Sequence, residues 1–307
     1  MNAPVSDISA AHQPLLFEMM RSFTTLAQRL NLSHAVQELN STRQTVRRHI
    51  AQLEEMRGER LFDVVDRRYE LTAAGRAALP DALDLLARAQ VWSLGQTGAH
   101  GALQYLKARE NDWEFYQQQQ PLGRIWTDES VLLRETFRAW MMASAEIENP
   151  ALAHVRPFLM VYRQGEAGWI CVEFGLKSAY VNWFGLDFAR SNIGRPIAQM
   201  PAGEEFGRLL YQSFHDVETT QCARLDHVYT RMPNQGGTSR TTMVYQRLMM
   251  PGFFPDRSPA VLNLVVPTAN VNIQDLEEEK RAAITQIDPP EFSPEDALFE
   301  KMVLGSV

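Results

Sequence analysis

The chain has 307 residues, of which 45% are hydrophobic and 22% are charged. This length exceeds one ordinary domain and favours two, and the composition is too balanced for wholesale disorder. Two cysteines are too few for a disulfide framework or a thiolate zinc site, and no apolar run reaches the roughly 18 residues that a membrane span needs. The first residues also lack the basic start and apolar run of a secretion signal, so we expect a cytoplasmic protein with no membrane partner.

The net charge of −7 is unevenly spread along the chain. Residues 1–90 hold eleven arginines and eleven acidic residues, so the deficit falls in residues 91–307, with 19 basic and 26 acidic residues. No lysine precedes Lys107. Attraction to nucleic acid must therefore come from local clusters of arginine. Two such clusters are visible, at Arg43, Arg47 and Arg48 and at Arg67 and Arg68.

Hydrophobic periodicity predicts three helices at the start of the chain. Apolar residues recur at three- and four-residue spacing from Pro14 to Leu30, and Ser33 is placed to cap a short helix that ends at Leu39. A third helix is predicted from Arg43 to Met56, with Thr42 as its cap. The turn before this helix is too short for a bundle hairpin, which predicts that the third helix crosses the second as in a helix-turn-helix.

The third helix has a polar face opposite its apolar one. Val46, Ile50 and Leu53 recur at helical spacing and are expected to face inward. The opposite face combines long side chains that can reach base edges with donors that can bind phosphates. The residues that we expect to contact DNA there are Arg43, Gln44, Arg47 and Arg48.

The next segment predicts a wing and a long helix. Leu61 to Leu71 reads as two short strands around a turn, where Arg67 and Arg68 would lie near the phosphate backbone. Thr72 then caps an amphipathic helix that Pro80 should kink. Its apolar stripe has few partners within so small a domain, so we predict that it pairs with a second copy in a homodimer.

The run SHAVQELNSTRQTVRRHIAQLEEMRGERLFDVVDRRYELTAAG resembles the DNA-binding domain of LysR-type regulators, over about residues 17–90. The resemblance implies a dimeric, sequence-specific bacterial regulator of transcription, with DNA contacts at Thr42 and at the third-helix residues given above. The arginine usual in the family two residues after Phe62 is Val64 here, with Arg67 and Arg68 as candidate substitutes. The alternating strands and helices of the family's inducer-binding region do not follow in residues 100–307.

The remaining sequence predicts a mixture of helices and strands. Asp112 to Glu148 reads as aromatic-rich helix, interrupted at residues 121–123. Five strands are expected, the first two joined by a hairpin turn and separated from the last three by helices over Ser178–Phe184 and Glu204–Val217. These strands are predicted at Phe158–Tyr162, Trp169–Glu173, Arg224–Met232, Thr241–Met250 and Ala260–Val266.

This element order, together with the segment YVNWFGLDFARSNIGRPI, resembles a PAS domain over about residues 155–268. The resemblance implies one five-stranded antiparallel sheet with helices, in an α+β protein. The expected organisation is a winged helix-turn-helix over 14–75, a linker and dimerisation helix over 76–108, a helical connector over 109–150, a PAS-like sensory or dimerisation domain over 151–269 and a C-terminal tail over 270–307.

Candidate ligand sites in the second half are less defined. Trp169, Tyr180, Trp183, Phe184 and Phe214 could line an aromatic pocket, although such residues more often form core. PAS domains hold haem, flavin or small acids in some cases and nothing known in others, so the resemblance predicts no particular cofactor.

Catalysis and metal binding find little support in the sequence. Cys171 reads as a buried apolar residue, and His215 and His227 lack a nearby second metal ligand. No GxSxG, HExxH, P-loop or GxGxxG arrangement is present, so we predict no enzymatic activity and no metal site.

The sequence is compatible with two functional hypotheses. The favoured one is a dimeric regulator that binds double-stranded DNA. RNA polymerase or another regulator is an open candidate for a further partner. The alternative is a winged-helix interaction module that no longer binds DNA, which the neutral charge of residues 1–90 and Val64 would suit.

Overall fold

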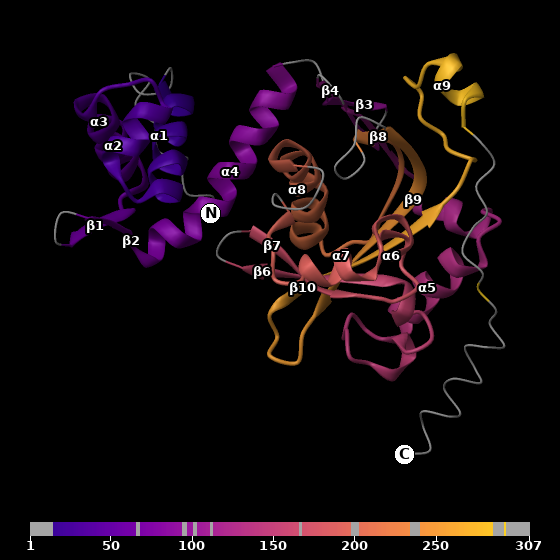
Figure 1. Ribbon diagram of the computed structural model, residues 1–307. Coiled ribbons are helices and arrows are strands. Elements are labelled where there is room, and N and C mark those ends of the chain that lie inside the picture. The colour runs from indigo at the N-terminus through magenta and orange to yellow at the C-terminus, as the bar shows by residue number, and fades with distance from the viewer. Residues whose placement is uncertain are drawn as a thin grey trace, which may run out of the picture. The chain divides into compact units, whose positions relative to one another are not determined.

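The computed structural model describes residues 15–65, 68–93, 97–100, 103–110, 113–165, 168–197, 203–233 and 240–284, and Phe292. It divides into two compact units, residues 1–90 and 91–307. Figure 1 shows the helical N-terminal unit and the sheet-based C-terminal unit. The mixture of helix and antiparallel sheet confirms the α+β class.

Three helices build most of the N-terminal unit, in the order that periodicity predicts: α1 (Leu16–Arg29), α2 (Leu32–Glu38) and α3 (Arg43–Arg57). Leu30 ends α1 in the left-handed conformation, with φ of 47°, and Gly58 ends α3 in the same way. The cap of α2 differs from the prediction. Asn31, not Ser33, precedes this helix, because the Asn31 Oδ1 accepts hydrogen bonds from the backbone N–H groups of Ser33 and His34.

A two-stranded hairpin and a long helix complete this unit. Strands β1 (Phe62–Val65) and β2 (Arg68–Leu71) pair antiparallel, and α4 (Ala73–Ser93) follows. The side chains of Leu79 and Ala82 on α4 are buried with those of α1 and α3 in one core. The apolar stripe of α4 therefore has partners within its own unit over its first half, contrary to our expectation.

The prediction of a linker helix over 76–108 and a helical connector over 109–150 was wrong in part. Helix α4 ends at Ser93, and three strands follow: β3 (Thr97–His100), β4 (Leu103–Glu110) and β5 (Trp113–Gln120). Helical structure returns only with η2 (Leu122–Trp126) and α5 (Val131–Met142). The run Gln117–Gln120 in β5 accounts for the error, because such a polar run is not typical of a covered strand, yet Gln117, Gln118 and Gln120 are buried.

The described strands of the C-terminal unit form one antiparallel sheet of eight, in the order β3-β4-β5-β8-β9-β10-β6-β7. The expected sheet of five strands was therefore too small, because β3, β4 and β5 extend it beyond β8. The five predicted strands are all present, as β6 (Leu159–Gly165), β7 (Gly168–Phe174), β8 (Arg224–Pro233), β9 (Arg240–Phe253) and β10 (Pro259–Pro267).

Helices cover both faces of this sheet. On β9, Tyr245 and Met249 belong to a core shared with α6 (Ala179–Phe184) and α8 (Gly203–Thr220). Helix α7 (Leu186–Ser191) packs on α6 through the ring of Phe188. Leu248 and Met250 face the opposite side, where they pack with α5 and with η3 (Pro150–Leu152) and η4 (Arg156–Phe158). Both faces of β9 are thus buried, as the alternation of side chains along a strand requires.

The region assigned to a C-terminal tail is partly packed. Ile273 and Leu276 are buried against Tyr116 and Tyr229, and the short helix α9 (Glu278–Ala282) follows. The ring of Phe292 packs edge-on against Phe158. The other residues of the predicted tail beyond 284 lie outside the described part of the chain.

Candidate nucleic-acid interface

The turn between α2 and α3 sets the start of the candidate recognition helix. Asn40 adopts a left-handed φ of 47°, and the Ser41 N–H donates to the carbonyl of Val36. The Thr42 hydroxyl then accepts a hydrogen bond of 3.1 Å from the Thr45 N–H, which satisfies one of the free amides at the N-terminus of α3. The predicted cap at Thr42 is confirmed.

The structure places the five predicted contact residues on one exposed surface. Val46, Ile50 and Leu53 are buried on the opposite side of α3. The exposed residues are Thr42, Arg43, Gln44, Arg47 and Arg48. We call this set the α3 face.

Two of its arginines are free to bind another molecule. Arg43 donates to the Ser33 hydroxyl at 2.8 Å, which ties α3 to α2. Arg47 and Arg48, by contrast, make no hydrogen bond or ion pair with any residue in the described part of the chain. Their guanidinium groups therefore remain available for phosphates or for base edges.

A buried polar contact that the sequence did not reveal holds α3 against α1. The hydroxyl of Ser22 and the Nδ1 of His49 lie 2.8 Å apart, and both side chains are buried. Burial lowers the pKa of His49, and the neighbouring positive charge of Arg48 lowers it further. Both effects favour the neutral form of this imidazole, which lies directly behind the α3 face.

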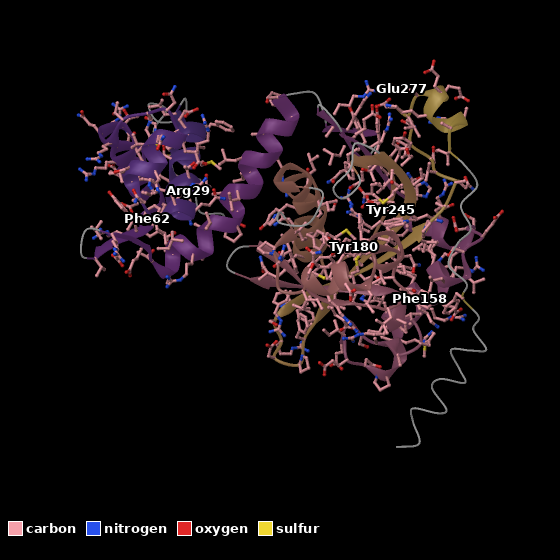
Figure 2. All side chains as sticks on the ribbon, in the orientation of Figure 1. Arg29, Phe62, Phe158, Tyr180, Tyr245 and Glu277 are labelled. Atoms are coloured by element: carbon pink, nitrogen blue, oxygen red, sulfur yellow. The ribbon has the colours of Figure 1, made fainter. Side chains whose placement is uncertain are left out.

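Glu54 fixes the start of the wing, the hairpin of β1 and β2. Its carboxylate accepts hydrogen bonds from the backbone N–H groups of Leu61, at 2.8 Å, and Phe62, at 3.2 Å. The Phe62 ring, marked in Figure 2, packs edge-on against Phe23 and Tyr69. These contacts join α3, the wing and α1 at one point.

The far end of the wing joins α4 just as closely. Thr72 donates from its hydroxyl to the Arg60 carbonyl at 2.6 Å and accepts from the Gly75 N–H at 2.9 Å. A Cβ on Gly75 would lie 2.1 Å from the Leu61 carbonyl oxygen, so only glycine suits this crossing.

The wing itself carries both charged and apolar side chains. Arg68 is exposed at the start of β2, whereas the predicted contact Arg67 lies outside the described residues. Val64 is 56% exposed and Val65 is 48% exposed. The side chain that replaces the usual arginine therefore does point into solvent, and Arg68 is the described cation nearest to it on the hairpin.

The predicted aromatic residues of the C-terminal unit form core instead of a visible pocket. Trp169 and Phe214 are each 1% exposed and lie 5.6 Å apart between ring centroids. Tyr180 stacks on Phe174, and the ring centroids of Trp183 and Tyr245 lie 5.4 Å apart. Tyr180 and Tyr245 are labelled in Figure 2. A cavity beside Arg224 is lined by none of the five predicted aromatic residues.

Burial accounts for two of the three residues considered for metal or redox chemistry, Cys171 and His227. Cys171 is fully buried, which raises the pKa of its thiol well above the usual range. Burial also lowers the pKa of His227 to about 4, and its Nδ1 accepts a hydrogen bond from the Asn272 N–H. Among the described residues, no cluster of three or more His, Cys, Asp or Glu side chains could hold a metal ion. No described helix is long and apolar enough to cross a membrane.

Comparison with known proteins assigns a family to the N-terminal segment. Residues 17–76 match the family of bacterial regulatory helix-turn-helix proteins, lysR family. This segment is a LysR-type helix-turn-helix. The chain is also 36% identical over 84 residues to the HTH-type transcriptional regulator ShiR of Corynebacterium glutamicum (strain R). That match covers 27% of this chain and 28% of ShiR, so the chain spans little more than a quarter of the relative's length.

Solved structures match a similar share of the chain. The CbnR_DBD–DNA complex is 32% identical, with 26% of this chain and 94% of that chain covered and a TM-score of 0.24. The structure of CbnR, a LysR family transcriptional regulator, is 31% identical, with 26% and 29% covered and a TM-score of 0.24. These similarities cover about a quarter of the chain and give no information about the fold or function of the rest.

Proposed function

We propose that this protein is a sequence-specific DNA-binding regulator of transcription that reads bases with α3. The observation that carries the proposal is the α3 face, where Arg47 and Arg48 are exposed and make no hydrogen bond or ion pair with the described residues. Gln44 on the same face is suited to a bidentate pair with adenine, and an arginine to one with guanine. Thr42, Arg43 and Arg68 would position the domain on the phosphate backbone.

The regulator is proposed to act as a homodimer. Leu85 on α4 is 54% exposed, so this helix offers apolar surface beyond the part that its own unit covers. A two-fold symmetric dimer requires a symmetric operator, with half-sites one helical turn or a multiple of it apart.

The C-terminal unit is proposed to regulate DNA binding. Strands β6 and β7, then α6, α7 and α8, then β8, β9 and β10 follow in the order on which the PAS resemblance depends. The additional strands β3, β4 and β5 distinguish this sheet from the five-stranded one that we expected.

Capture of bound DNA across the host genome, followed by a mobility-shift titration on the strongest fragment, tests the proposal. We expect discrete sites that share a symmetric motif. The Arg47→Ala/Arg48→Ala variant should bind this fragment at least about 30-fold more weakly, because each lost bidentate base contact costs about 1–3 kcal/mol. If one of the arginines binds phosphate instead, the affinity of the variant should also depend less on salt. The slope of log affinity against log salt concentration should become shallower by about 0.9 for each lost phosphate contact.

The Arg21→Ala/Arg57→Ala variant is the matched control. It removes the same charge from the same unit, but Arg21 is paired with Glu18 at 3.2 Å and Arg57 with Glu59 at 2.8 Å, away from the α3 face. This control should bind DNA like the wild type. Equal affinity of the Arg47→Ala/Arg48→Ala variant would contradict the assignment of α3, and an absence of any enriched site or shift would favour the interaction module.

A further inference from the structure

The α8-facing side of the sheet contains a buried group of charges within an otherwise apolar core. Asp226 on β8 is completely buried and accepts hydrogen bonds from two arginines, Arg224 at 2.9 Å and Arg247 at 2.9 Å. Arg224 also pairs with Asp216 of α8 at 2.8 Å. The two pairs that Asp226 makes are buried on both sides. Such pairs are an expensive way to stabilise a core, since apolar residues of similar volume often serve as well. Their presence points to a binding role.

The amides around these arginines have a fixed orientation. The guanidinium of Arg247 donates to the Oε1 of Gln117 at 2.7 Å, and that of Arg224 donates to the Oε1 of Gln104 at 2.8 Å. An arginine offers no acceptor, so each amide must turn its oxygen toward it and its NH2 group away. The NH2 group of Gln117 then donates to Ser213 at 2.9 Å.

Hydrogen-bond donors are therefore in excess at this site. The Oε1 atoms of Gln104 and Gln117 and the carboxylates of Asp216 and Asp226 already accept from arginine. Within the described part of the chain, the Nη2 of Arg224 and the Nε2 of Gln104 make no hydrogen bond. A molecule that binds here must supply acceptor oxygens, and a negative charge would suit the guanidinium best.

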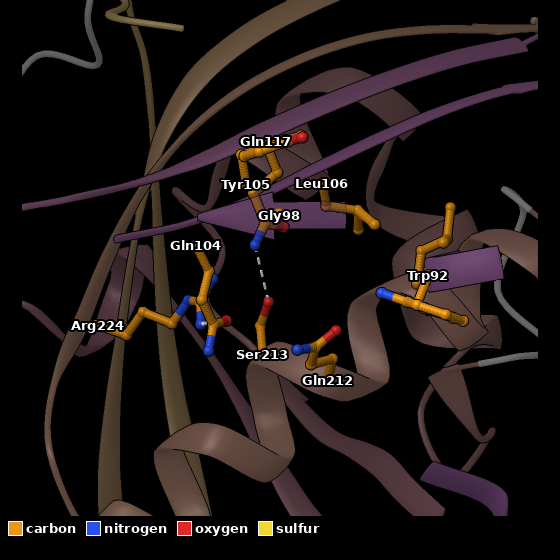
Figure 3. Close-up of a pocket in the computed structure, with 10 residues that line it drawn as sticks. Trp92, Gly98, Gln104, Tyr105, Leu106, Gln117, Gln212, Ser213 and Arg224 are labelled. Atoms are coloured by element: carbon orange, nitrogen blue, oxygen red, sulfur yellow. Dashed lines mark hydrogen bonds between the residues drawn. The ribbon is translucent and has the colours of Figure 1, made fainter. Parts of the chain in front are cut away.

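A cavity of about 180 Å³ lies beside this group (Figure 3). Gln104, Gln117, Ser213 and Arg224 form its polar part. The other part is largely apolar and aromatic. It is lined by Trp92, Tyr105, Leu106 and Leu209, with Gln212 and the backbone of Gly98 completing the wall. A cavity of roughly 150 Å³ holds one benzene molecule, so this one has room for a single ring and a small substituent.

We propose that this cavity binds a small monocarboxylate whose apolar body is no larger than about one six-membered ring. Its carboxylate would accept from Arg224 and Gln104, and its apolar body would contact Leu106 and Leu209. Asp216 and Asp226 already balance the charges of Arg224 and Arg247, so a second negative charge on the ligand would have no partner here.

Such a ligand would also contact the last turn of α4. Trp92 lines the cavity and belongs to the helix that begins at Ala73 in the N-terminal unit. On the basis of the proposed function, the occupied cavity would alter DNA affinity through this helix. Binding of the carboxylate itself does not depend on that function.

Calorimetric titration of the full chain with benzoate, cyclohexanecarboxylate and 3-methylbutanoate tests the site without DNA. We expect at least one of the three to bind. Benzamide should bind at least about tenfold more weakly than benzoate, because it lacks the charge that strengthens hydrogen bonds to a guanidinium.

The Gln212→Trp variant fills the cavity from a partly exposed position outside the ion-pair group, so it should fold and lower the affinity at least tenfold. The Thr219→Trp variant is its control, since it adds the same side chain to an exposed position of α8 that does not line the cavity. It should bind like the wild type.

No binding by any of the three acids, equal affinity for benzamide, or full affinity in Gln212→Trp would each overturn the proposal. In the mobility-shift assay, whichever acid binds most tightly should change the DNA affinity of the wild type but not of Gln212→Trp. If the protein binds an acid but no DNA, this site is supported and the proposed function is contradicted. If it binds DNA but no acid, the proposed function is supported and this site is contradicted.

Discussion

In the N-terminal unit the arginines of α3 lie at the surface, whereas in the C-terminal unit Arg224 and Arg247 lie inside the α8-facing core. Arg47 and Arg48 are left without a hydrogen-bonded partner among the described residues. Arg247, by contrast, donates hydrogen bonds to Asp226, Gln117 and Ser213. Exposure and hydrogen-bond partners therefore decide whether an arginine serves recognition or supports the fold.

The difference between the arginines of the two units indicates where charge limits stability and where it serves recognition. A surface guanidinium keeps its hydration until a ligand arrives, so its removal should affect binding more than folding. A buried guanidinium has lost its water, so the carboxylate that pairs with it is required for the fold.

Asp226→Asn should destabilise the C-terminal unit by about 3–5 kcal/mol, because it leaves the charges of Arg224 and Arg247 buried without their shared carboxylate. All six tryptophans lie in residues 91–307, so denaturant unfolding followed by tryptophan fluorescence reports on this unit. Asp256→Asn is the control, since Asp256 pairs with Arg163 at the surface. A midpoint for Asp226→Asn equal to that of the control would show that the buried pairs do not support the fold.

The sequence predicted the N-terminal unit well because its determinants are local. Helical spacing and the cap at Thr42 defined α3, and the α3 face is exposed as expected. The predicted role of these residues in DNA binding stays a prediction. The contact between Ser22 and His49 was missed because the two residues are 27 positions apart and nothing in the local pattern pairs them.

The C-terminal unit was predicted less well because distant partners decide its structure. Gln117 and Gln118 look solvated in sequence but are buried in β5, with hydrogen bonds to Ser213 and to the Gln274 N–H. Both faces of the strand are covered, so polar and apolar residues do not alternate as they would in a half-exposed strand. The acid-binding cavity likewise combines segments that are more than 100 residues apart.

Acid should weaken the C-terminal unit through His227. Burial lowers its pKa to about 4, with Arg124 acting in the same direction and Asp128 and Asp226 opposing it. Because the pKa is lower in the folded chain than its usual value of about 6.5, stability is complete above about pH 6.5 and is lost as the pH falls toward about 4. The loss should approach roughly 3 kcal/mol.

Protonation of His227 would also place a new N–H at Nδ1, against the Asn272 N–H that now donates to it at 2.7 Å. The His227→Asn variant provides an acceptor in a similar place and does not titrate, so its free energy of unfolding should fall less over this range. Tryptophan fluorescence at a series of pH values measures both proteins. Parallel curves for the two would exclude His227 as the cause.

Glu54→Ala should have the smallest effect on stability and a clear one on the wing. It leaves the N–H groups of Leu61 and Phe62 without their carboxylate acceptor, which should cost about 1.5 kcal/mol and loosen the start of β1. Amide hydrogen exchange in β1 and β2 should quicken, and DNA affinity should fall while the α3 face stays unchanged.

Glu55→Ala is the matched control, because this neighbouring glutamate is exposed and its side chain accepts neither of these N–H groups. Both variants remove one negative charge from the same turn of α3, so any general gain in attraction to phosphate is common to the two. The difference between them isolates the position of the wing. If Glu54→Ala quickened exchange in the wing and yet bound DNA as Glu55→Ala does, the wing would contribute little to affinity, and recognition would rest on the exposed arginines of α3 alone.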